Sequence, residues 1–207
     1  MEPRQDIRRS QILHGNHVAH NKYTQPDTEK KMAFEIGIPN VTFSMRIETD
    51  ESPGFTWQQV PSMDLFKGKR IALFGLPGAF TPTCSSTHLP GFDAEYEKLI
   101  ESGFDEVYCI SVNDSFTMNA WFDKLEVRHV KPIPDGNGDF TRALGMLVKK
   151  DNLGFGLRSW RYSAIVEDGM VKQLFVEDGL CDNAESDPFA VSDVYTLLDF
   201  VSREETS

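Results

Sequence analysis

The residue with the clearest chemical potential is Cys84, in the segment LPGAFTPTCSSTHLPGF at positions 76–92. A cysteine thiolate is a strong nucleophile and the neutral thiol a weak one, so its surroundings decide whether it reacts. Thr81 is well placed as the N-cap of a helix, with Pro82 at the first helical position and Cys84 at the third. The third position faces the exposed N–H groups of the first turn, where an anion is favoured. The spacing therefore places Cys84 where a negative charge is favoured.

The helix N-terminus does not suffice to ionise such a thiol. A thiol with its free pKa of about 8.5 is only a few per cent ionised at neutral pH, and nearly full ionisation requires about 3–4 kcal/mol of extra stabilisation. A helix N-terminus supplies about 0.3–1 kcal/mol, and about 2 kcal/mol in partly buried geometries. A cation must supply the rest, and the candidates are His88, one turn further along the helix, and a distant arginine that the fold brings in.

The alternative is that Cys84 is a small buried apolar residue and that the prolines and glycines around it only shape a turn. The elements around it favour the chemical interpretation. Apolar segments with strand character alternate with segments of helical period, an order that favours an α/β fold with a parallel-rich sheet. The expected strands are 70–75 and 107–112, and the expected helices run from the Thr81 cap to Glu101 and over 116–125.

Further local patterns predict a hairpin and two helix starts. Residues 161–177 contain Asp-Gly between two segments of alternating polarity, which predicts an antiparallel hairpin next to the sheet. Ser192 is expected to cap a C-terminal helix with one apolar face. The DGNG sequence after Pro134 is expected to form a turn before a helix that Asp139 caps. Trp121 and its neighbour Phe122 are expected in the core.

Composition predicts one globular domain and excludes several partners. The chain has 207 residues, a formal net charge of −11 and a pI near 4.9. This charge disfavours nucleic acids and anionic membrane surfaces, since both are bound by basic faces. No apolar stretch approaches the roughly 20 residues of a membrane-spanning helix. The three cysteines are too few and of the wrong parity for a disulfide framework, which favours a reducing compartment and a cytoplasmic location.

We expect three regions along the chain. Residues 1–31 contain few apolar side chains to offset the entropy of ordering, so they are expected to form a disordered N-terminal extension. Residues 32–203 are expected to form the domain and residues 204–207 a short tail. The histidines of the HGNHVAH tract, at positions 14–20, lack flanking acidic ligands, so no metal site is expected there.

Several segments resemble the peroxiredoxin family. PGAFTPTC is similar to the peroxiredoxin active-site motif Pro-x-x-x-Thr-x-x-Cys, with Pro77, Thr81 and Cys84 at the three fixed positions. CSSTHLPGF, CISVND and RSWRYSAIVEDG resemble the peroxiredoxin 5, or type II, subgroup, and the similarity runs from about residue 36 to 201. DPFAVSDVYTLL, at 187–198, resembles the end of the peroxiredoxin half of bacterial peroxiredoxin–glutaredoxin fusions. The glutaredoxin half does not follow, so a reductant acting in trans is expected.

The resemblance implies a thioredoxin fold, in which helices flank a mixed central sheet, and reduction of hydrogen peroxide and organic hydroperoxides without a cofactor. It implies that Cys84 is the peroxidatic cysteine, that Thr81 offers its hydroxyl to the thiolate and the peroxide, and that Pro77 shields the site from water. In the family the catalytic arginine precedes an aromatic residue and a serine, which selects Arg161, with Arg158 as the weaker choice. A homodimer is implied, with glutathione, glutaredoxin or thioredoxin as reductant.

Cys109 and Cys181 are the candidates for resolving the sulfenic acid. Cys109 is expected in the core, but its CISVND context resembles plant type II enzymes, in which that cysteine is proposed to be resolving. Cys181 lies in an expected loop and resembles the resolving cysteine of animal peroxiredoxin 5 if a gap is allowed. A disulfide requires Cα atoms within about 7 Å, whereas an external thiol needs only access. We predict mainly one-cysteine cycling by glutathione with glutaredoxin, and an atypical two-cysteine cycle is the alternative.

Three other functions would use the same residues. A thiol–disulfide oxidoreductase is disfavoured because no second cysteine lies within three residues of Cys84. A cysteine hydrolase based on Cys84 and His88 is disfavoured because both lie on one helix and no oxyanion-hole motif accompanies them. A redox-sensing or chaperone-like protein that uses Cys84 as a switch stays open, and its rate of reaction with peroxide distinguishes it from a peroxidase.

Overall fold

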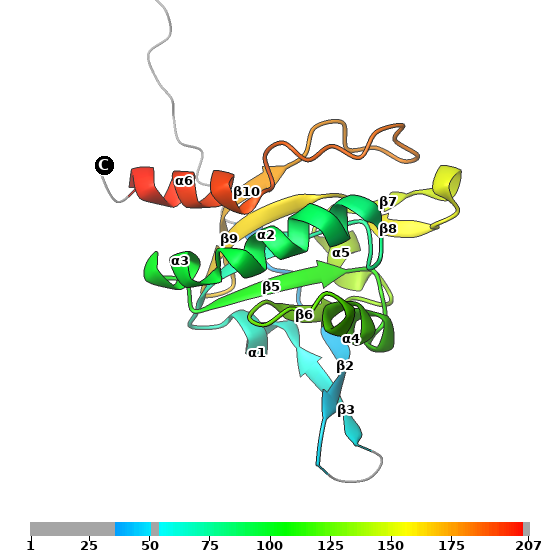
Figure 1. Ribbon diagram of the computed structural model, residues 1–207, viewed down its shortest axis with the longest axis horizontal. Coiled ribbons are helices and arrows are strands. Elements are labelled where there is room, and N and C mark those ends of the chain that lie inside the picture. Colours follow the sequence, from blue (N-terminus) through cyan, green and yellow to red (C-terminus); the bar gives the residue numbers. More distant parts are fainter. Residues whose placement is uncertain (1–35, 51–53, 205–207) are drawn as a thin grey trace, which may run out of the picture. The chain divides into compact units, whose positions relative to one another are not determined.

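The centre of the structure is a six-stranded sheet with the strand order β1-β10-β9-β4-β5-β6 (Figure 1). The structure is a computed structural model that describes residues 36–50 and 54–204. The expected extension 1–31 lies outside the described residues, as do residues 205–207 of the expected tail. The strands of the sheet are β1 (Ile36–Gly37), β4 (Arg70–Gly75), β5 (Glu106–Ser111), β6 (Lys131–Pro134), β9 (Tyr162–Glu167) and β10 (Met170–Val176).

The pairing of the strands confirms the predicted mixed sheet. β4 and β5 are parallel, as are β5 and β6, while β9 runs antiparallel to both β4 and β10. The predicted hairpin is β9–β10, and its turn is formed by Asp168 and Gly169, with φ of 47° and 76°. Two consecutive positive φ angles match the right-handed twist of the strands, and Asp and Gly adopt them at little cost.

Helices cover both faces of the sheet. Along β4, Ala72 and Phe74 belong to one buried cluster, and Ile71 and Leu73 belong to the other, because successive side chains of a strand point to opposite faces. The first cluster also contains Trp121, as predicted. The helices of the first cluster are α2 (Leu89–Ala94), α3 (Tyr96–Glu101), α4 (Ser115–Lys124) and α6 (Val194–Glu204), and those of the second are α1 (Ser62–Phe66) and α5 (Asp139–Ala143).

Two additional antiparallel pairs lie outside the central sheet. β2 (Thr42–Glu48) and β3 (Phe55–Pro61) extend away from it, and β7 (Leu147–Lys149) pairs with β8 (Leu157–Ser159) (Figure 1). A short 3₁₀ turn at Asp151–Leu153 links β7 and β8. Over the described ranges, no helix is both long and apolar enough to cross a membrane.

Two predicted helix caps are wrong by a few residues. Asp193, not Ser192, caps α6, and its carboxylate accepts the N–H groups two and three residues later at 2.9 and 3.1 Å. The Ser192 hydroxyl donates instead to the buried carboxylate of Glu177 at 2.7 Å. Asp139 is the first residue of α5, and the side chain that accepts N–H groups at this helix start is the buried Asp135, at 3.2 and 2.8 Å. At α6, a contact distant in sequence, from Ser192 to Glu177, decides between two neighbouring residues of similar capping propensity.

The end of β4 is packed so closely that only glycine fits. Gly75 pairs with Tyr162 on β9, and a Cβ atom at Gly75 would lie 2.2 Å from the Tyr162 ring. The bare backbone therefore allows this ring to lie against the sheet at the point where the chain leaves β4 for the loop that leads to Cys84. Arg161 directly precedes Tyr162, so the same packing brings Arg161 to this end of β4.

Candidate active site

Cys84 lies in the first turns of the helical segment that follows β4. The Thr81 carbonyl accepts the first helical hydrogen bond, from Ser85 N–H at 3.0 Å, and Pro82 is the first helical residue, as predicted. Residues Cys84–His88 form a π-helical turn, η1, which the sequence did not predict. Such turns inside α-helices are frequent at functional sites. Phe80, before the helix, has φ of 62°, a left-handed conformation unusual for a bulky residue and found mostly where the surrounding structure imposes it.

Arg161 is the cation that the structure brings to Cys84. Its side chain is buried, and Nη1 lies 3.5 Å from Cys84 Sγ and 3.2 Å from His88 Nδ1. Its Nη2 donates to the Asp187 carboxylate. Arg158, the weaker of the two predicted choices, donates to the Val112 carbonyl at 2.8 Å instead.

His88 is a neutral partner of Arg161 and not a second cation. Its Nε2 lies 3.1 Å from the Ser192 carbonyl, which can only accept, so Nε2 carries the proton. Nδ1 is then free to accept from Arg161. Burial, and after it the Arg161 charge, holds the pKa of His88 well below its usual value. The imidazole is therefore uncharged at neutral pH, and of the two cations considered from the sequence only Arg161 supplies charge at the thiol.

The segment between β10 and α6 closes this side of the site. It carries Asp187 to Arg161 and the Ser192 carbonyl to His88. The buried carboxylate of Glu177 anchors the segment by accepting the N–H groups of residues 190–192 at distances of 2.8–3.0 Å. Burial raises the pKa of Glu177, but the hydrogen bonds from the Ser192 hydroxyl and from these N–H groups outweigh it and hold the pKa below its usual value. Sequence reasoning did not single out Asp187 or Glu177.

The loop before the helix is held by Asn113. Its Oδ1 accepts from Ala79 N–H at 3.0 Å and from the Ser111 hydroxyl at 2.8 Å. The Thr81 hydroxyl donates to the Gly78 carbonyl at 2.8 Å, and within the described part of the chain it caps no helical N–H group. Its backbone occupies the predicted N-cap position, while its side chain serves the loop. Pro77 is buried beside this loop.

Aromatic side chains form the apolar surroundings of the site. The His88 ring lies 4.9 Å from the Phe74 ring and 4.8 Å from the Phe189 ring, measured between centroids. On α4, the Trp121 indole N–H donates to the Ser85 hydroxyl at 3.0 Å, directly after Cys84 in the chain. Trp121 is thus a core residue, as predicted, and it also fixes the turn that carries the thiol.

The other two cysteines have different surroundings. Cys109 is fully buried on β5 and shares the apolar cluster of Cys84. Burial, and after it the nearby Cys84, raises the pKa of Cys109 well above its usual value. Cys181 is exposed in the segment between β10 and α6. All three cysteines are free thiols.

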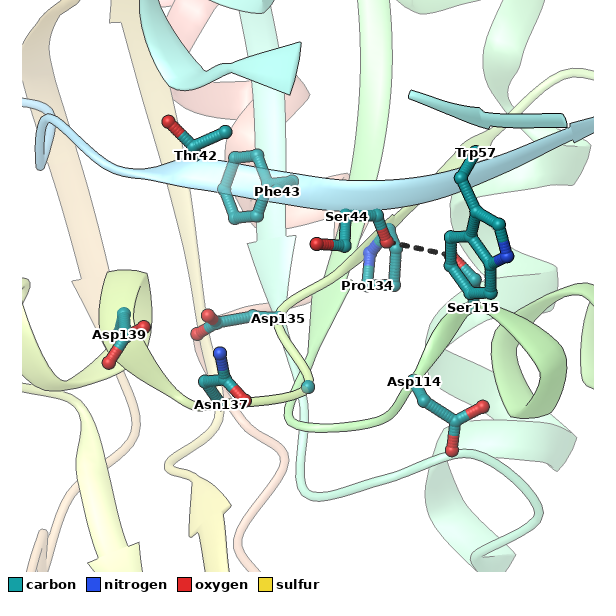
Figure 2. A pocket seen from close by; sticks show the side chains of 11 residues that line it. Thr42, Phe43, Ser44, Trp57, Asp114, Ser115, Pro134, Asp135, Asn137 and Asp139 are labelled. Atoms are coloured by element: carbon teal, nitrogen blue, oxygen red, sulfur yellow. Dashed lines mark hydrogen bonds between the residues drawn. The ribbon is translucent and has the colours of Figure 1, made fainter. Parts of the chain in front are cut away.

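A pocket of about 190 Å³ elsewhere on the surface does not serve this chemistry. Figure 2 shows its lining, which comes from β2, β3 and the loops that precede α4 and α5 and includes none of the residues around Cys84. Its carboxylates are largely engaged as helix caps, since Asp114 caps α4 and Asp135 caps α5. At its rim the Ser115 hydroxyl donates to the Ser44 carbonyl at 3.1 Å.

A metal centre has no support in the described residues, among which no three His, Cys, Asp or Glu side chains are grouped to hold an ion. The tract with His14, His17 and His20 lies outside the described residues.

Comparisons with known proteins identify the family of the chain. A family model described as Redoxin matches residues 42–193. A peroxiredoxin of Rhizobium etli is 48% identical over 170 residues, which cover 81% of this chain and 95% of that protein. The hybrid peroxiredoxin hyPrx5 of Haemophilus influenzae is 45% identical over 165 residues, covering 80% of this chain and 64% of that protein. The crystal structure of a Plasmodium falciparum antioxidant protein, a 1-Cys peroxiredoxin, aligns with a TM-score of 0.78 and 37% identity over 82% of this chain and 99% of that chain.

The matches extend over most of the chain, and the residues matched by the family model include both the turn with Cys84 and the segment with Arg161. They confirm the predicted thioredoxin-like fold, with helices on both faces of a mixed sheet, and the resemblance to the peroxiredoxin 5, or type II, kind. The chain belongs to the peroxiredoxin family and is a thiol-dependent peroxidase, with peroxides as substrates and thiols as reductants.

Proposed function

We propose that Cys84 is the peroxidatic cysteine and that it reduces hydrogen peroxide and organic hydroperoxides with the help of Arg161 and Thr81. The observation that carries this assignment is the 3.5 Å contact between Arg161 Nη1 and Cys84 Sγ inside a buried site. A guanidinium keeps its charge under all physiological conditions, and a hydrogen bond from it favours the thiolate over the thiol. In the described residues, neither Cys109 nor Cys181 has an arginine contact of this kind.

The proposed step transfers one oxygen atom to sulfur. The Cys84 thiolate attacks one peroxide oxygen, the O–O bond breaks, and the second oxygen leaves and takes up a proton to become water or an alcohol. Negative charge develops on the leaving oxygen, so N–H donors fixed beside it lower the barrier. Arg161 is one such donor. The Thr81 hydroxyl donates to Gly78, which leaves its oxygen to accept the O–H of the peroxide.

We propose that an external thiol resolves the sulfenic acid. Glutathione attacks the sulfur of Cys84, water leaves, and a mixed disulfide forms, which glutaredoxin then reduces. Cys109 is a poor alternative because its raised pKa keeps it a thiol, and the thiolate is the attacking species. Cys181 is exposed, but its segment is held by hydrogen bonds from Lys149 N–H to Asp182 and from Asn183 N–H to the Lys149 carbonyl. A disulfide from Cys181 would have to disrupt these contacts.

Three further assignments rest on the resemblance and the composition. Free cysteines, one of them exposed, suit a reducing compartment such as the cytoplasm. Glutaredoxin is proposed over thioredoxin because residues 187–198 resemble the end of the peroxiredoxin half of bacterial peroxiredoxin–glutaredoxin fusions. A homodimer is proposed from the family resemblance, and sedimentation of the reduced protein tests it.

A reductant comparison tests the resolution pathway. Peroxide consumption by the native chain and by Cys84→Ser is followed with three reductants. These are glutathione plus glutaredoxin, thioredoxin plus its reductase, and glutathione alone. We expect turnover with glutathione plus glutaredoxin and none in Cys84→Ser. Turnover with the thioredoxin system but not with glutathione plus glutaredoxin would refute the proposed reductant. Turnover in Cys84→Ser would refute the proposed nucleophile. A native chain whose Cys84 reacts only slowly with peroxide would favour the redox-sensing alternative.

A further inference from the structure

The contact between Asp187 and Arg161 gives the guanidinium its second anchor. Of the Arg161 nitrogens, Nη1 faces both Cys84 and His88, and Nη2 faces Asp187. Nε has no hydrogen-bond partner in the described residues. Asp187 provides the only carboxylate that the described part of the chain pairs with Arg161.

We propose that Asp187 is a positioning residue for peroxide reduction, which holds the Arg161 guanidinium in the plane that directs Nη1 at Cys84 and at the same time moderates its charge. The proposal rests on the assignment of Cys84 and Arg161 given above. Asp187 acts through Arg161 and touches no reacting atom.

The geometry explains why one anchor is not enough. A guanidinium is planar, so fixing both terminal nitrogens fixes its orientation. His88 holds the same nitrogen that faces the sulfur, and with this anchor alone the rest of the group could pivot about Nη1. Asp187 holds the other nitrogen, and Phe189, two residues later, places its ring 5.5 Å from Arg161 Cζ. Arg161 can stabilise the negative charge that develops on the leaving oxygen only if its N–H groups point at that oxygen. A displacement of about 1 Å can lower the rate by about 100-fold.

The hydrogen bond of Asp187 favours the reaction by orienting Arg161, whereas the negative charge of Asp187 opposes it. A carboxylate beside the guanidinium offsets part of its positive potential, so the Cys84 thiolate is less stabilised than it would be beside an unpaired arginine. The other titratable groups around the sulfur carry no charge at neutral pH, because His88 is a neutral imidazole and Cys109 a thiol. Removing the charge of Asp187 and removing its hydrogen bond therefore have separable consequences.

Asp187→Asn and Asp187→Ala separate the two effects. Asn keeps an oxygen that can accept from Nη2 and loses only the charge, whereas Ala loses both. The ultraviolet absorbance of the thiolate gives the pH at which Cys84 ionises, and stopped-flow mixing with hydrogen peroxide gives the rate constant at a pH where the thiolate is complete. Asp187 is partly exposed, so both variants are expected to fold, and circular dichroism checks this.

In Asp187→Asn we expect the thiolate to form at lower pH than in the native chain, with a rate constant within about threefold of the native one. In Asp187→Ala we expect the rate constant to fall by about tenfold or more. Asp182→Asn is the control, because Asp182 lies in the same segment but accepts from Lys149 N–H and does not touch Arg161. It should leave both measurements unchanged.

The proposal is overturned if Asp187→Ala reacts at the native rate, if the thiolate of Asp187→Asn forms at unchanged or higher pH, or if Asp182→Asn slows the reaction as much as Asp187→Ala does. The last result would mean that Asp187 only holds the segment together. Failure of the assignment of Cys84 looks different, since the native chain itself would then show no rapid reaction that Cys84→Ser abolishes.

Discussion

Replacing Arg161 by methionine removes the only charged donor that the described residues place against Cys84. Methionine preserves much of the apolar length of the side chain, and Arg161 is 1% exposed, so solvent screens the lost charge little. The change also removes the partner of His88 Nδ1. It leaves Asp187 unpaired, but the Asp187 side chain is 37% exposed and water can solvate it.

The size of the effect follows from the contact distance. A hydrogen bond to a charged group contributes about 1.5–3 kcal/mol, below the roughly 4 kcal/mol of Coulomb energy for two unit charges about 4 Å apart at an effective dielectric constant of about 20. Losing it destabilises the thiolate relative to the thiol, so Arg161→Met is expected to form the thiolate at higher pH than the native chain. Loss of a donor to the leaving oxygen should also lower the rate constant for reaction with peroxide by about 100-fold, and this loss should persist at a pH where the thiolate is fully formed.

The assay combines thiolate absorbance against pH with stopped-flow reaction at several pH values. Arg158→Met is the matched control, because Arg158 donates to the Val112 carbonyl and does not contact Cys84. We expect it to lower stability by about 1 kcal/mol and to leave the thiolate titration unchanged. If Arg161→Met titrates like the native chain while Arg158→Met shifts, the arginine has been assigned wrongly. If Arg161→Met regains the native rate once its thiolate is complete, Arg161 does not stabilise the leaving oxygen.

Three further predictions concern other parts of the structure. An unfolded histidine titrates near pH 6.5, whereas the folded pKa of His88 is lower, so the unfolded chain binds more protons below pH 6.5 and stability falls as the pH falls. Between about pH 6 and 5, the unfolding free energy of His88→Gln should therefore fall less steeply with falling pH than that of the native chain, by about 1 kcal/mol per pH unit. Urea unfolding at several pH values measures this, and the same pH dependence in both proteins would contradict a neutral His88. Asp193→Ala should cost about 1 kcal/mol through loss of the α6 cap, and restoration of that stability by Asp193→Ser but not by Asp193→Val would confirm a cap. Cys109→Ser and Cys181→Ser should each keep most activity with glutathione plus glutaredoxin, and loss of turnover with every reductant in Cys181→Ser, together with an intramolecular disulfide in the native chain, would establish a two-cysteine cycle instead.

Local patterns predicted the elements that carry the site. The strand over 70–75, the helix start at Pro82 and the Asp-Gly hairpin all depend on residues within a few positions of each other, and all three are found as predicted. The π turn at Cys84–His88 was not predicted, because the amino acids there are equally compatible with an α-helix.

The contacts that complete the site could not be predicted in the same way. Arg161 lies 77 residues from Cys84 and was selected by family resemblance, since no local pattern distinguishes it from Arg158. Asp187 is one of 32 acidic residues, and only the path of the segment after β10 brings it to Arg161. The displaced cap at α6 has a similar cause, because the Ser192 hydroxyl is taken by Glu177, 15 residues earlier.

The most direct test of the account is to identify the sulfur that peroxide oxidises. The reduced chain is mixed with one equivalent of hydrogen peroxide in the presence of a probe that reacts only with sulfenic acids, and the labelled peptides are identified by mass spectrometry. The account predicts rapid labelling of the peptide that contains Cys84 and none of those that contain Cys109 and Cys181. Rapid labelling of either of the other two cysteines while Cys84 stays a thiol would contradict it.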